Sequence, residues 1–245
     1  MALIAKPVLR ARRAFRDWLA AQPAIFEPIA RRRQFHDRVV AGPDTDIVIE
    51  GYPRSGNTYG AFAFVVAQGG VANVASHFHT PAQFALAARY RRPAVLVIRK
   101  PLEVVVSNLR FFPWMTPNFA LRTYISFHKR CLKNLDRLVV SDFPETTGRF
   151  GHVIERVNRK FGTAFAIYQG TPDDEKKTRN LVEHSREVWV SADKLDGSPD
   201  KVALPTPEKA ANRAEFERQF VRDADPVLLK KAEDIYALIL ARANG

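Results

Sequence analysis

The sequence is poor in cysteine and has no long apolar run. Cys131 is the single cysteine among 245 residues, which excludes an internal disulfide and a zinc site built from cysteines. We predict that Cys131 is a small apolar filler in the core. No apolar run reaches the roughly 18 residues that a membrane span needs, and no stretch near the beginning has the form of a secretory signal. These absences favour a cytoplasmic protein.

The sequence also lacks the motifs of nucleic-acid readers, although its charge is strongly positive. The formal net charge is +12, which favours anionic partners or a strong surface field. No zinc finger, helix-turn-helix or RNA-binding motif can be read, so nucleic acid is not expected as a partner. Half of the net charge lies in residues 1–40, which hold nine basic and three acidic residues.

Residues 7–40 have the pattern of two basic amphipathic helices divided at Pro23. One interpretation is a peripheral contact with a membrane or another anionic surface. The other, which we favour from the sequence, is a helical extension packed on the domain with a solvated basic face. Nothing in the sequence predicts an oligomeric state.

Length and composition favour a single domain of residues 1–245. Hydrophobic residues make up 46% of the chain, enough to bury a full core. Short apolar runs at 46–52, 71–77, 94–98 and 136–143 have the length of strands, and helical patterns lie between them. We therefore predict an α/β fold, a P-loop-like three-layer sandwich with a central, mostly parallel sheet flanked by helices.

Four regions follow one another along this domain. The order is a basic helical extension at 1–41, a cofactor-binding core at 45–165, an irregular loop or lid at 170–207, and C-terminal helices at 208–245.

Residues Gly51 to Tyr59 join the first predicted strand to a helix and form a candidate anion site. At such a turn the backbone N–H groups and the positive end of the helix dipole converge on one spot. Arg54 adds a positive charge, and Ser55 and Thr58 add hydroxyl groups.

The same turn nearly fits the phosphate loop G-x-x-x-x-G-K-[ST]. Gly51, Gly56 and Thr58 have the required spacing, but Asn57 stands in place of the lysine. In an NTPase that lysine reaches the β- and γ-phosphates. Its loss argues against ordinary ATP or GTP hydrolysis.

Two motifs resemble the cofactor sites of sulfotransferases that use 3′-phosphoadenosine 5′-phosphosulfate (PAPS). Tyr52-Pro53-Arg54-Ser55-Gly56-Asn57-Thr58-Tyr59 resembles the family's 5′-phosphosulfate loop, Tyr-Pro-Lys-Ser-Gly-Thr-Thr-Trp. Arg99-Lys100-Pro101-Leu102-Glu103-Val104-Val105-Val106-Ser107 resembles its 3′-phosphate site, Arg-Asn-Pro-x-Asp-x-x-x-Ser. The resemblance covers residues 45–165. It implies PAPS as the donor, PAP as the product, and no metal.

The resemblance also implies roles for the motif residues. The 5′ end of PAPS would be bound by Arg54, Ser55, Gly56, Asn57 and Thr58. Within this set, Arg54 would contact the oxygen that bridges phosphate and sulfate. Arg99 and Ser107 would bind the 3′-phosphate. Tyr59 occupies the family's tryptophan position and would stack on adenine. The alternative for Arg99 is an ion pair with Glu103, four residues further on.

A general base for the acceptor is expected at the end of the second predicted strand. His77 and His79 lie two residues apart and so on one face, and histidine titrates near neutral pH. His79-Thr80-Pro81 resembles the family's His-Leu-Pro after the catalytic histidine, so we favour His79 over His77. The histidines without a motif context, expected in surface or core roles, are His36, His128, His152 and His184.

The acceptor is expected to be a small molecule or a carbohydrate with a hydroxyl or amine group. An aromatic segment either lines an apolar acceptor pocket or packs in the core, and its members are Phe111, Phe112, Trp114, Met115 and Phe119. The family's late Arg-Lys-Gly element is absent. Candidates to replace it are Lys176, Lys177, Arg179, Lys209 and Arg213.

Two other functions remain open from the sequence. A nucleotide or small-molecule kinase would bind ATP and magnesium, which the missing loop lysine disfavours. A non-catalytic polyanion-binding protein would use the basic N-terminal region, and its binding would fall steeply with salt.

Overall fold

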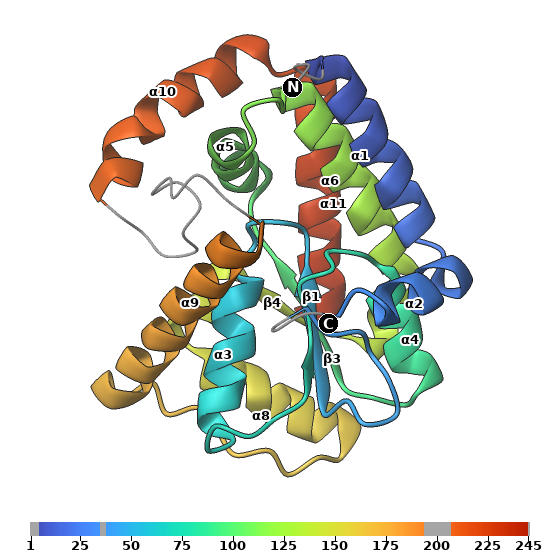
Figure 1. The fold of residues 1–245 in the computed structure, drawn as a ribbon, viewed down its shortest axis with the longest axis vertical. Coiled ribbons are helices and arrows are strands. Elements are labelled where there is room, and N and C mark those ends of the chain that lie inside the picture. The colour runs from blue at the N-terminus through green and yellow to red at the C-terminus, as the bar shows by residue number, and fades with distance from the viewer. Residues whose placement is uncertain (1–4, 35–37, 194–206, 245) are drawn as a thin grey trace.

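A four-stranded parallel sheet forms the centre of the molecule (Figure 1). The computed structural model describes residues 5–34, 38–193 and 207–244. Its strands are β1 (Ile47–Gly51), β2 (Val74–Ala75), β3 (Ala94–Ile98) and β4 (Val139–Asp142). The strand order is β2-β1-β3-β4, and every neighbouring pair is parallel. The predicted α/β class with a parallel central sheet is confirmed.

Helices cover both faces of this sheet, which gives three layers (Figure 1). One layer consists of α3 (Asn57–Ala67), α8 (Phe150–Phe161) and α9 (Pro172–Asp193). The other consists of α4 (Ala82–Arg89), α5 (Pro101–Phe111), α6 (Pro117–Cys131) and α11 (Pro226–Asn244). Ile49 and Val97 face the first core, and Val48 and Leu96 face the second. Successive residues of a strand point to opposite faces, so two cores enclose the sheet.

Two helices begin close to where the central strands end. Gly51, the last residue of β1, pairs with Val97 of β3. The helix α3 begins at Asn57, and α5 begins at Pro101. The carboxyl ends of β1 and β3 and the amino ends of α3 and α5 therefore meet at one edge, which is where open α/β sheets bind ligands.

The outer strands β2 and β4 are shorter than the sequence predicted. Beyond Ala75, the chain leaves the parallel ladder, because Ser76 forms an antiparallel bridge with Val39 and donates its hydroxyl to the Ile49 carbonyl at 2.7 Å. Before β4, the residues expected to start the strand belong to a 3₁₀ helix, η1 (Leu132–Arg137). After β4, the helix α7 (Phe143–Gly148) begins at once.

The N-terminal region forms the two helices that the sequence predicted. They are α1 (Lys6–Ala20) and α2 (Pro23–Arg31), divided at Pro23. The helix α2 buries Phe26 and Ala30, whereas α1 buries no residue. Within the described residues, no helix combines the length and the apolar character that crossing a bilayer would require.

The predicted irregular loop is wrong for its first half, because Pro172–Asp193 is the helix α9, which lies against α3 (Figure 1). Its start is stabilised by a capping box: the Thr171 hydroxyl accepts from the Asp174 N–H, and the Asp174 carboxylate accepts from the Thr171 N–H. Residues 194–206 lie outside the described residues. The chain closes with α10 (Pro207–Asp223) and α11.

Candidate active site at the carboxyl edge of the sheet

Two glycines shape the turn between β1 and α3. A Cβ atom at Gly51 would lie 2.2 Å from the carbonyl oxygen of Val97 on the neighbouring strand, so no other residue fits there. Gly56 has a φ of 105°, and a Cβ atom there would lie 3.1 Å from the Phe143 ring. Gly56 also precedes α3, whose first N–H groups have no side-chain cap. Such N–H groups are ready donors for an anion.

Two side chains of this turn are buried with unpaired acceptor atoms. Ser55 and Asn57 are 0% and 2% exposed, and neither Ser55 Oγ nor Asn57 Oδ1 has a hydrogen-bond partner among the described residues. Buried polar atoms are nearly always paired, so these two atoms indicate that the turn is completed by a ligand or by water.

Asn57 does not take the part of the phosphate-loop lysine that it replaces. Its Nδ2 atom donates to the Gly51 carbonyl at 3.1 Å and lies 3.1 Å from His79 Nδ1. The amide is therefore turned towards the end of β1. It ties the loop to the strand and carries no charge towards a phosphate.

Arg54 and Ser107, which belong to different motifs, are in direct contact. The Nε atom of Arg54 donates to Ser107 Oγ at 3.1 Å, and the guanidinium lies over the Phe111 ring at 4.9 Å. Both partners come from α5, so this helix positions the loop arginine. The two anion motifs thus form one continuous site.

Arg99 links the same two segments from the end of β3. Its Nη1 atom donates to the Arg54 carbonyl at 3.2 Å, and its guanidinium stacks on the Phe143 ring at 3.9 Å. The ion pair with Glu103 that was the alternative is also present, at 3.1 Å. Burial lowers the pKa of Arg99, but an arginine stays charged at neutral pH. Arg99 is therefore an oriented cation at the edge of the sheet.

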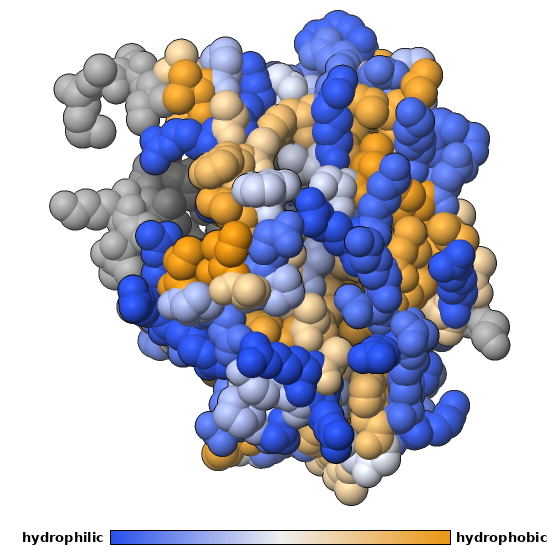
Figure 2. Space-filling model, turned by 90° about the vertical axis from the view of Figure 1, so that its right-hand side faces the viewer, coloured by the Kyte–Doolittle hydropathy of each residue, from blue (hydrophilic) through white to orange (hydrophobic). Residues whose placement is uncertain are grey.

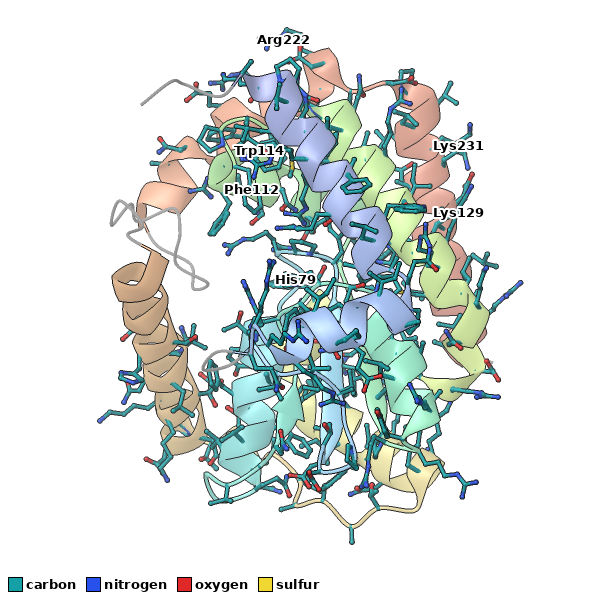
Figure 3. The ribbon with its side chains drawn as sticks, turned by 45° about the vertical axis from the view of Figure 1, so that its right-hand side comes forward. His79, Phe112, Trp114, Lys129, Arg222 and Lys231 are labelled. Carbon is teal, nitrogen blue, oxygen red and sulfur yellow. The ribbon has the colours of Figure 1, made fainter. Side chains whose placement is uncertain are left out.

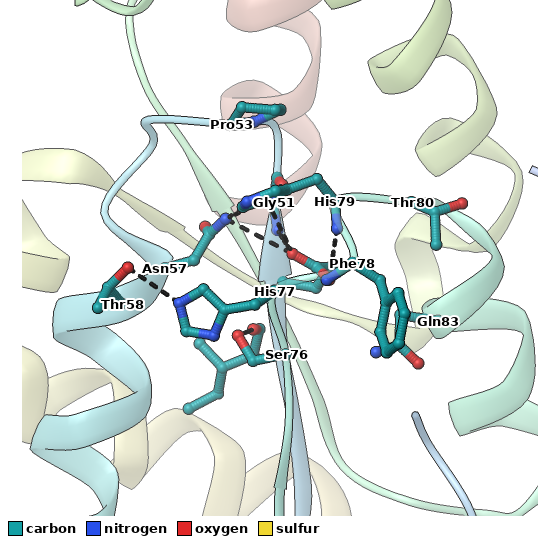
Figure 4. Close-up of polar contacts among 12 residues, drawn as sticks. Gly51, Pro53, Asn57, Thr58, Ser76, His77, Phe78, His79, Thr80 and Gln83 are labelled. Atoms are coloured by element: carbon teal, nitrogen blue, oxygen red, sulfur yellow. Dashed lines mark hydrogen bonds and ion pairs between the residues drawn. The ribbon is translucent and has the colours of Figure 1, made fainter. Parts of the chain in front are cut away.

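His77 and His79 follow β2 and both reach the turn after β1 (Figure 4). The Nε2 atom of His77 is 2.9 Å from Thr58 Oγ1, and the two imidazole rings lie 6.1 Å apart. His79 lies near the middle of the molecule, below Phe112 and Trp114 in Figure 3. The structure therefore brings both predicted histidines to the predicted loop.

The backbone at these positions is strained. His77, His79 and Arg54 have φ values of 64°, 53° and 73°. Only one other non-glycine residue in the described part of the chain, Arg91, has a positive φ. Left-handed conformations of such residues cost free energy, and they concentrate at functional sites.

Glu50 is the site residue that the sequence reasoning missed. It is fully buried in β1, and its Oε2 atom accepts the N–H groups of Phe78 and His79 at 3.0 and 2.9 Å. Its Oε1 atom accepts the Gly51 N–H at 3.0 Å and lies 3.4 Å from His79 Nδ1. The signal was visible, because Glu50 is the one charged residue in an otherwise apolar strand and buried charges are rare without a role.

These contacts favour a proton on Nδ1 of His79. Nδ1 lies near two acceptors, the Gly51 carbonyl at 3.1 Å and the Glu50 carboxylate at 3.4 Å, and near one donor, the Asn57 amide nitrogen at 3.1 Å. The two amide N–H groups of Asn57 have acceptors of their own in the Gly51 carbonyl and Glu50 Oε1, at 3.1 and 3.5 Å. A proton on Nδ1 then serves both of its neighbouring acceptors, so the other nitrogen, Nε2, keeps its lone pair. All hydrogen bonds and ion pairs of the His79 ring in the described chain involve Nδ1. His79 is therefore a candidate base whose Nε2 atom is left out of these contacts.

Tyr59 is held between α3 and the segment before α9. Burial, and after it the neighbouring Tyr168, raises the pKa of Tyr59. Its ring packs beside the core that contains Phe64. The predicted stacking on adenine remains a prediction.

The basic residues considered as replacements for the missing Arg-Lys-Gly element differ in position. Lys177 pairs with Asp173 and Arg179 with Glu175 on the exposed side of α9. Arg213 on α10 is exposed and pairs with Glu217 at 2.6 Å, and after burial its charge also contributes to the lowered pKa of Arg99. The side chain of Lys209 lies outside the described residues. Arg213 is therefore the candidate that approaches the site.

The aromatic segment after α5 packs mainly on the core. Met115 is buried, and the rings of Phe112, Trp114 and Phe119 follow one another at 5.4 and 6.0 Å. A pocket of about 210 Å³ lies beside this segment, between the end of α5 and α10. Its lining residues are Leu109, Arg110, Pro113, Met115, Phe216 and Gln219.

The remaining groups at or near the sheet supply no further chemistry. Within the described chain, no three His, Cys, Asp or Glu residues cluster as metal ligands would. Asp142, at the end of β4, caps α7 by accepting the Glu145 N–H at 2.9 Å. His128 is fully buried and donates from Nδ1 to the Tyr124 carbonyl, a core role. Cys131 is fully buried, as predicted.

Comparisons with known proteins gave one similar structure. No family model matches this chain, and no curated protein matches it. The crystal structure of mouse sulfotransferase SULT7A1 complexed with PAP is similar at a TM-score of 0.40 and 12% sequence identity, over 81% of this chain and 91% of that chain. A likeness of this size carries no argument about function, which is drawn below from the site itself.

Proposed function

We propose that this chain is a sulfotransferase that moves a sulfuryl group from PAPS to a hydroxyl or amine of a small-molecule or carbohydrate acceptor. The observation that carries the proposal is the junction of two anion motifs with an oriented histidine. Arg54 of the first motif bonds Ser107 of the second at 3.1 Å, and His79 touches Asn57 of the first at 3.1 Å. A donor with two anionic ends needs two anion sites side by side.

The residues present fit the charges of such a donor. The uncapped start of α3, the unpaired Ser55 Oγ and the Arg54 guanidinium suit the 5′ end. Arg99 and Ser107 suit the 3′-phosphate. Arg213 of α10, whose charge reaches Arg99, would add positive charge in place of the missing Arg-Lys-Gly element. Charge-assisted hydrogen bonds of this kind are worth about 1.5–3 kcal/mol each.

The proposed chemistry needs an acceptor, a base and a stabilised leaving group. PAPS supplies the sulfuryl group on a phosphate leaving group. The acceptor oxygen would bond to sulfur as the bond from sulfur to the bridging oxygen breaks, and the acceptor proton would pass to His79 Nε2. Arg54 would bind the negative charge that grows on the bridging oxygen. His77 is the alternative base.

Glu50 would act on this reaction through His79. Its carboxylate lies 3.4 Å from Nδ1 and accepts the backbone N–H of the same residue at 2.9 Å. It would therefore hold the ring in place and stabilise the imidazolium that forms when Nε2 takes a proton, as the carboxylate of a catalytic triad does. We assign Glu50 as a positioning residue.

The rival functions have less support at the site. A kinase would need a cation where Asn57 instead bonds the Gly51 carbonyl, and it would need a magnesium ligand where Asp142 instead caps α7. A protein that only binds polyanions would have no use for a buried carboxylate against a histidine. We also keep a cytoplasmic location as a prediction.

Calorimetric titration with PAP, beside ATP with magnesium, tests the cofactor. We expect micromolar PAP binding, on the order of −8 kcal/mol, with weak or absent ATP binding. Arg99→Ala should lower the PAP affinity strongly, and the matched control Arg137→Ala, an exposed arginine beyond the far end of β4, should not. Tight ATP binding without PAP binding would favour the kinase, and binding of neither would refute a nucleotide site.

A further inference from the structure

The helix α1 is turned with its apolar side outward. Val8, Ala11, Phe15 and Trp18 are spaced at i, i+3, i+7 and i+10, so they share one face. Phe15 is 62% exposed, Trp18 53% and Val8 49%. The rings of Phe15 and Trp18 stack with centroids 6.1 Å apart. An amphipathic helix on a domain normally buries such a stripe, and here the stripe faces away from it.

Charged residues take the inward side of the same helix. Arg10, on the opposite face, donates to the Trp114 carbonyl at 3.0 Å. Arg13 bonds Asp17 at 2.7 Å and lies over the Phe112 ring at 5.7 Å. These contacts hold α1 by its polar face alongside α6 (Figures 1 and 3). The outward position of the apolar stripe is therefore fixed by specific bonds.

Exposed basic residues flank the apolar stripe. Arg12 and Arg16 are exposed beside Phe15 on α1. The neighbouring helix α2 exposes Ile25 and Ile29 at 38% and 46%, and the exposed Arg32 and Arg33 follow it. Figure 2 shows apolar patches among strongly hydrophilic side chains on the side of the molecule where α1 lies. From residue 5 to residue 34 the chain has eight basic and two acidic residues.

We propose that the outward face of α1, with Val8, Phe15 and Trp18 as its apolar part, binds the surface of an anionic phospholipid bilayer. Aromatic side chains favour the boundary between headgroups and acyl chains, and arginines beside them attract anionic lipids. A second copy of this chain would bring two strongly positive surfaces together, which like charges oppose. The proposal does not depend on the sulfotransferase assignment.

Flotation with vesicles of phosphatidylcholine, with and without phosphatidylserine, tests this proposal on the full chain. We expect binding to the vesicles that contain phosphatidylserine, weaker binding at high salt, and little binding to phosphatidylcholine alone. Phe15→Ser with Trp18→Ser should lower the partition at least roughly tenfold. Arg12→Gln with Arg16→Gln should lower it and flatten its salt dependence.

Matched controls distinguish binding through the outward face of α1 from nonspecific hydrophobic binding elsewhere on the surface. Val71→Ser with Val227→Ser removes apolar side chains that are 85% and 58% exposed elsewhere, and it should leave vesicle binding unchanged. All three double variants should keep the melting temperature of the wild type. Wild-type-like vesicle binding by the Phe15 and Trp18 variant would overturn the proposal.

Two further outcomes would assign the face to another occupant. If the wild type forms a dimer that the Phe15 and Trp18 variant does not form, and vesicles are not bound, the face joins two copies of the chain. If the wild type binds single-stranded RNA through Phe15 and Trp18 but does not bind vesicles, the face stacks on bases. Either result refutes the lipid assignment.

Discussion

At the scale of single residues, Glu50 and His79 form the centre of the candidate site. Burying a carboxylate costs free energy unless its oxygens accept hydrogen bonds. The Glu50 carboxylate accepts three backbone N–H groups, and one of its oxygens lies 3.4 Å from His79 Nδ1. These bonds come from β1 and from the turn after β2. The carboxylate therefore ties Phe78 and His79 to the turn after β1.

The two histidines can be distinguished by turnover. His79→Ala should lower kcat by about 10²–10⁴-fold, as expected when a general base is lost, with little change in PAP affinity. His77→Ala, which removes the contact with Thr58, should have a smaller effect on kcat. Steady-state kinetics on both variants, beside PAP titrations, provides the measurement. The opposite ranking would make His77 the base.

Glu50→Gln tests the positioning role. The substituted amide keeps one acceptor oxygen, which can still accept the Phe78 and His79 N–H groups, but it loses the acceptor for the Gly51 N–H and the charge that would stabilise the imidazolium. We expect kcat to fall by about 10–100-fold and the KM for PAPS to stay unchanged. Nitrogen NMR of His79 should report a proton on Nδ1 in the wild type. A proton on Nε2 would contradict the assignment.

At the scale of secondary-structure elements, α10 is the helix that we expect to complete the proposed site. Arg213→Ala should lower PAP affinity by roughly tenfold, the effect of one charge-assisted contact, and should reduce its salt dependence. Lys177→Ala on α9 serves as the control, because that lysine is exposed and paired with Asp173. If Lys177→Ala has the larger effect, the helix that reaches the donor is α9.

The sequence predicted the elements best where apolar runs and turn residues agreed. β1, β3, α3 and α5 occur where the patterns placed them, because strand periodicity, Gly56 and Pro101 all mark the same boundaries. The helix α9 was missed because its apolar side is narrow and its many charges suggested a solvated loop. The capping box formed by Thr171 and Asp174 was the sequence signal for the start of α9.

Contacts between distant segments were the part that the sequence could not supply. The first anion motif was found from its spacing, and the second motif and the preference for His79 came from the family resemblance. The bond from Arg54 to Ser107, by contrast, spans 53 positions. Glu50 needed the fold as well, since only the arrangement of β1 beside the turn after β2 shows what its carboxylate contacts. Likewise, the outward direction of Phe15 and Trp18 follows from the bonds of Arg10 and Arg13 on the other side of α1.

The whole molecule should lose stability in mild acid because of His128. Burial lowers the pKa of His128 from 6.5 to about 4. Between these two pH values the unfolded chain binds the proton more readily than the folded chain. The contribution of neutral His128 to the free energy of unfolding is therefore fully present above pH 6.5 and decreases as the pH falls towards 4. The loss amounts to about 3 kcal/mol. Denaturant titrations of the wild type and of His128→Phe at several pH values test this, and the variant should lack this step.

The left-handed backbone at Arg54, His77 and His79 implies a trade-off between thermal stability and activity. Each such residue lowers the free energy of unfolding by on the order of 1 kcal/mol, and substitution by asparagine or glycine would restore part of it. His77→Asn should therefore melt at a higher temperature than the wild type and turn over more slowly, which calorimetry and kinetics can compare. Directed evolution that rewards survival at high temperature alone should discard these three side chains early. Engineering of this scaffold for durability therefore has to start elsewhere, at positions remote from the turn.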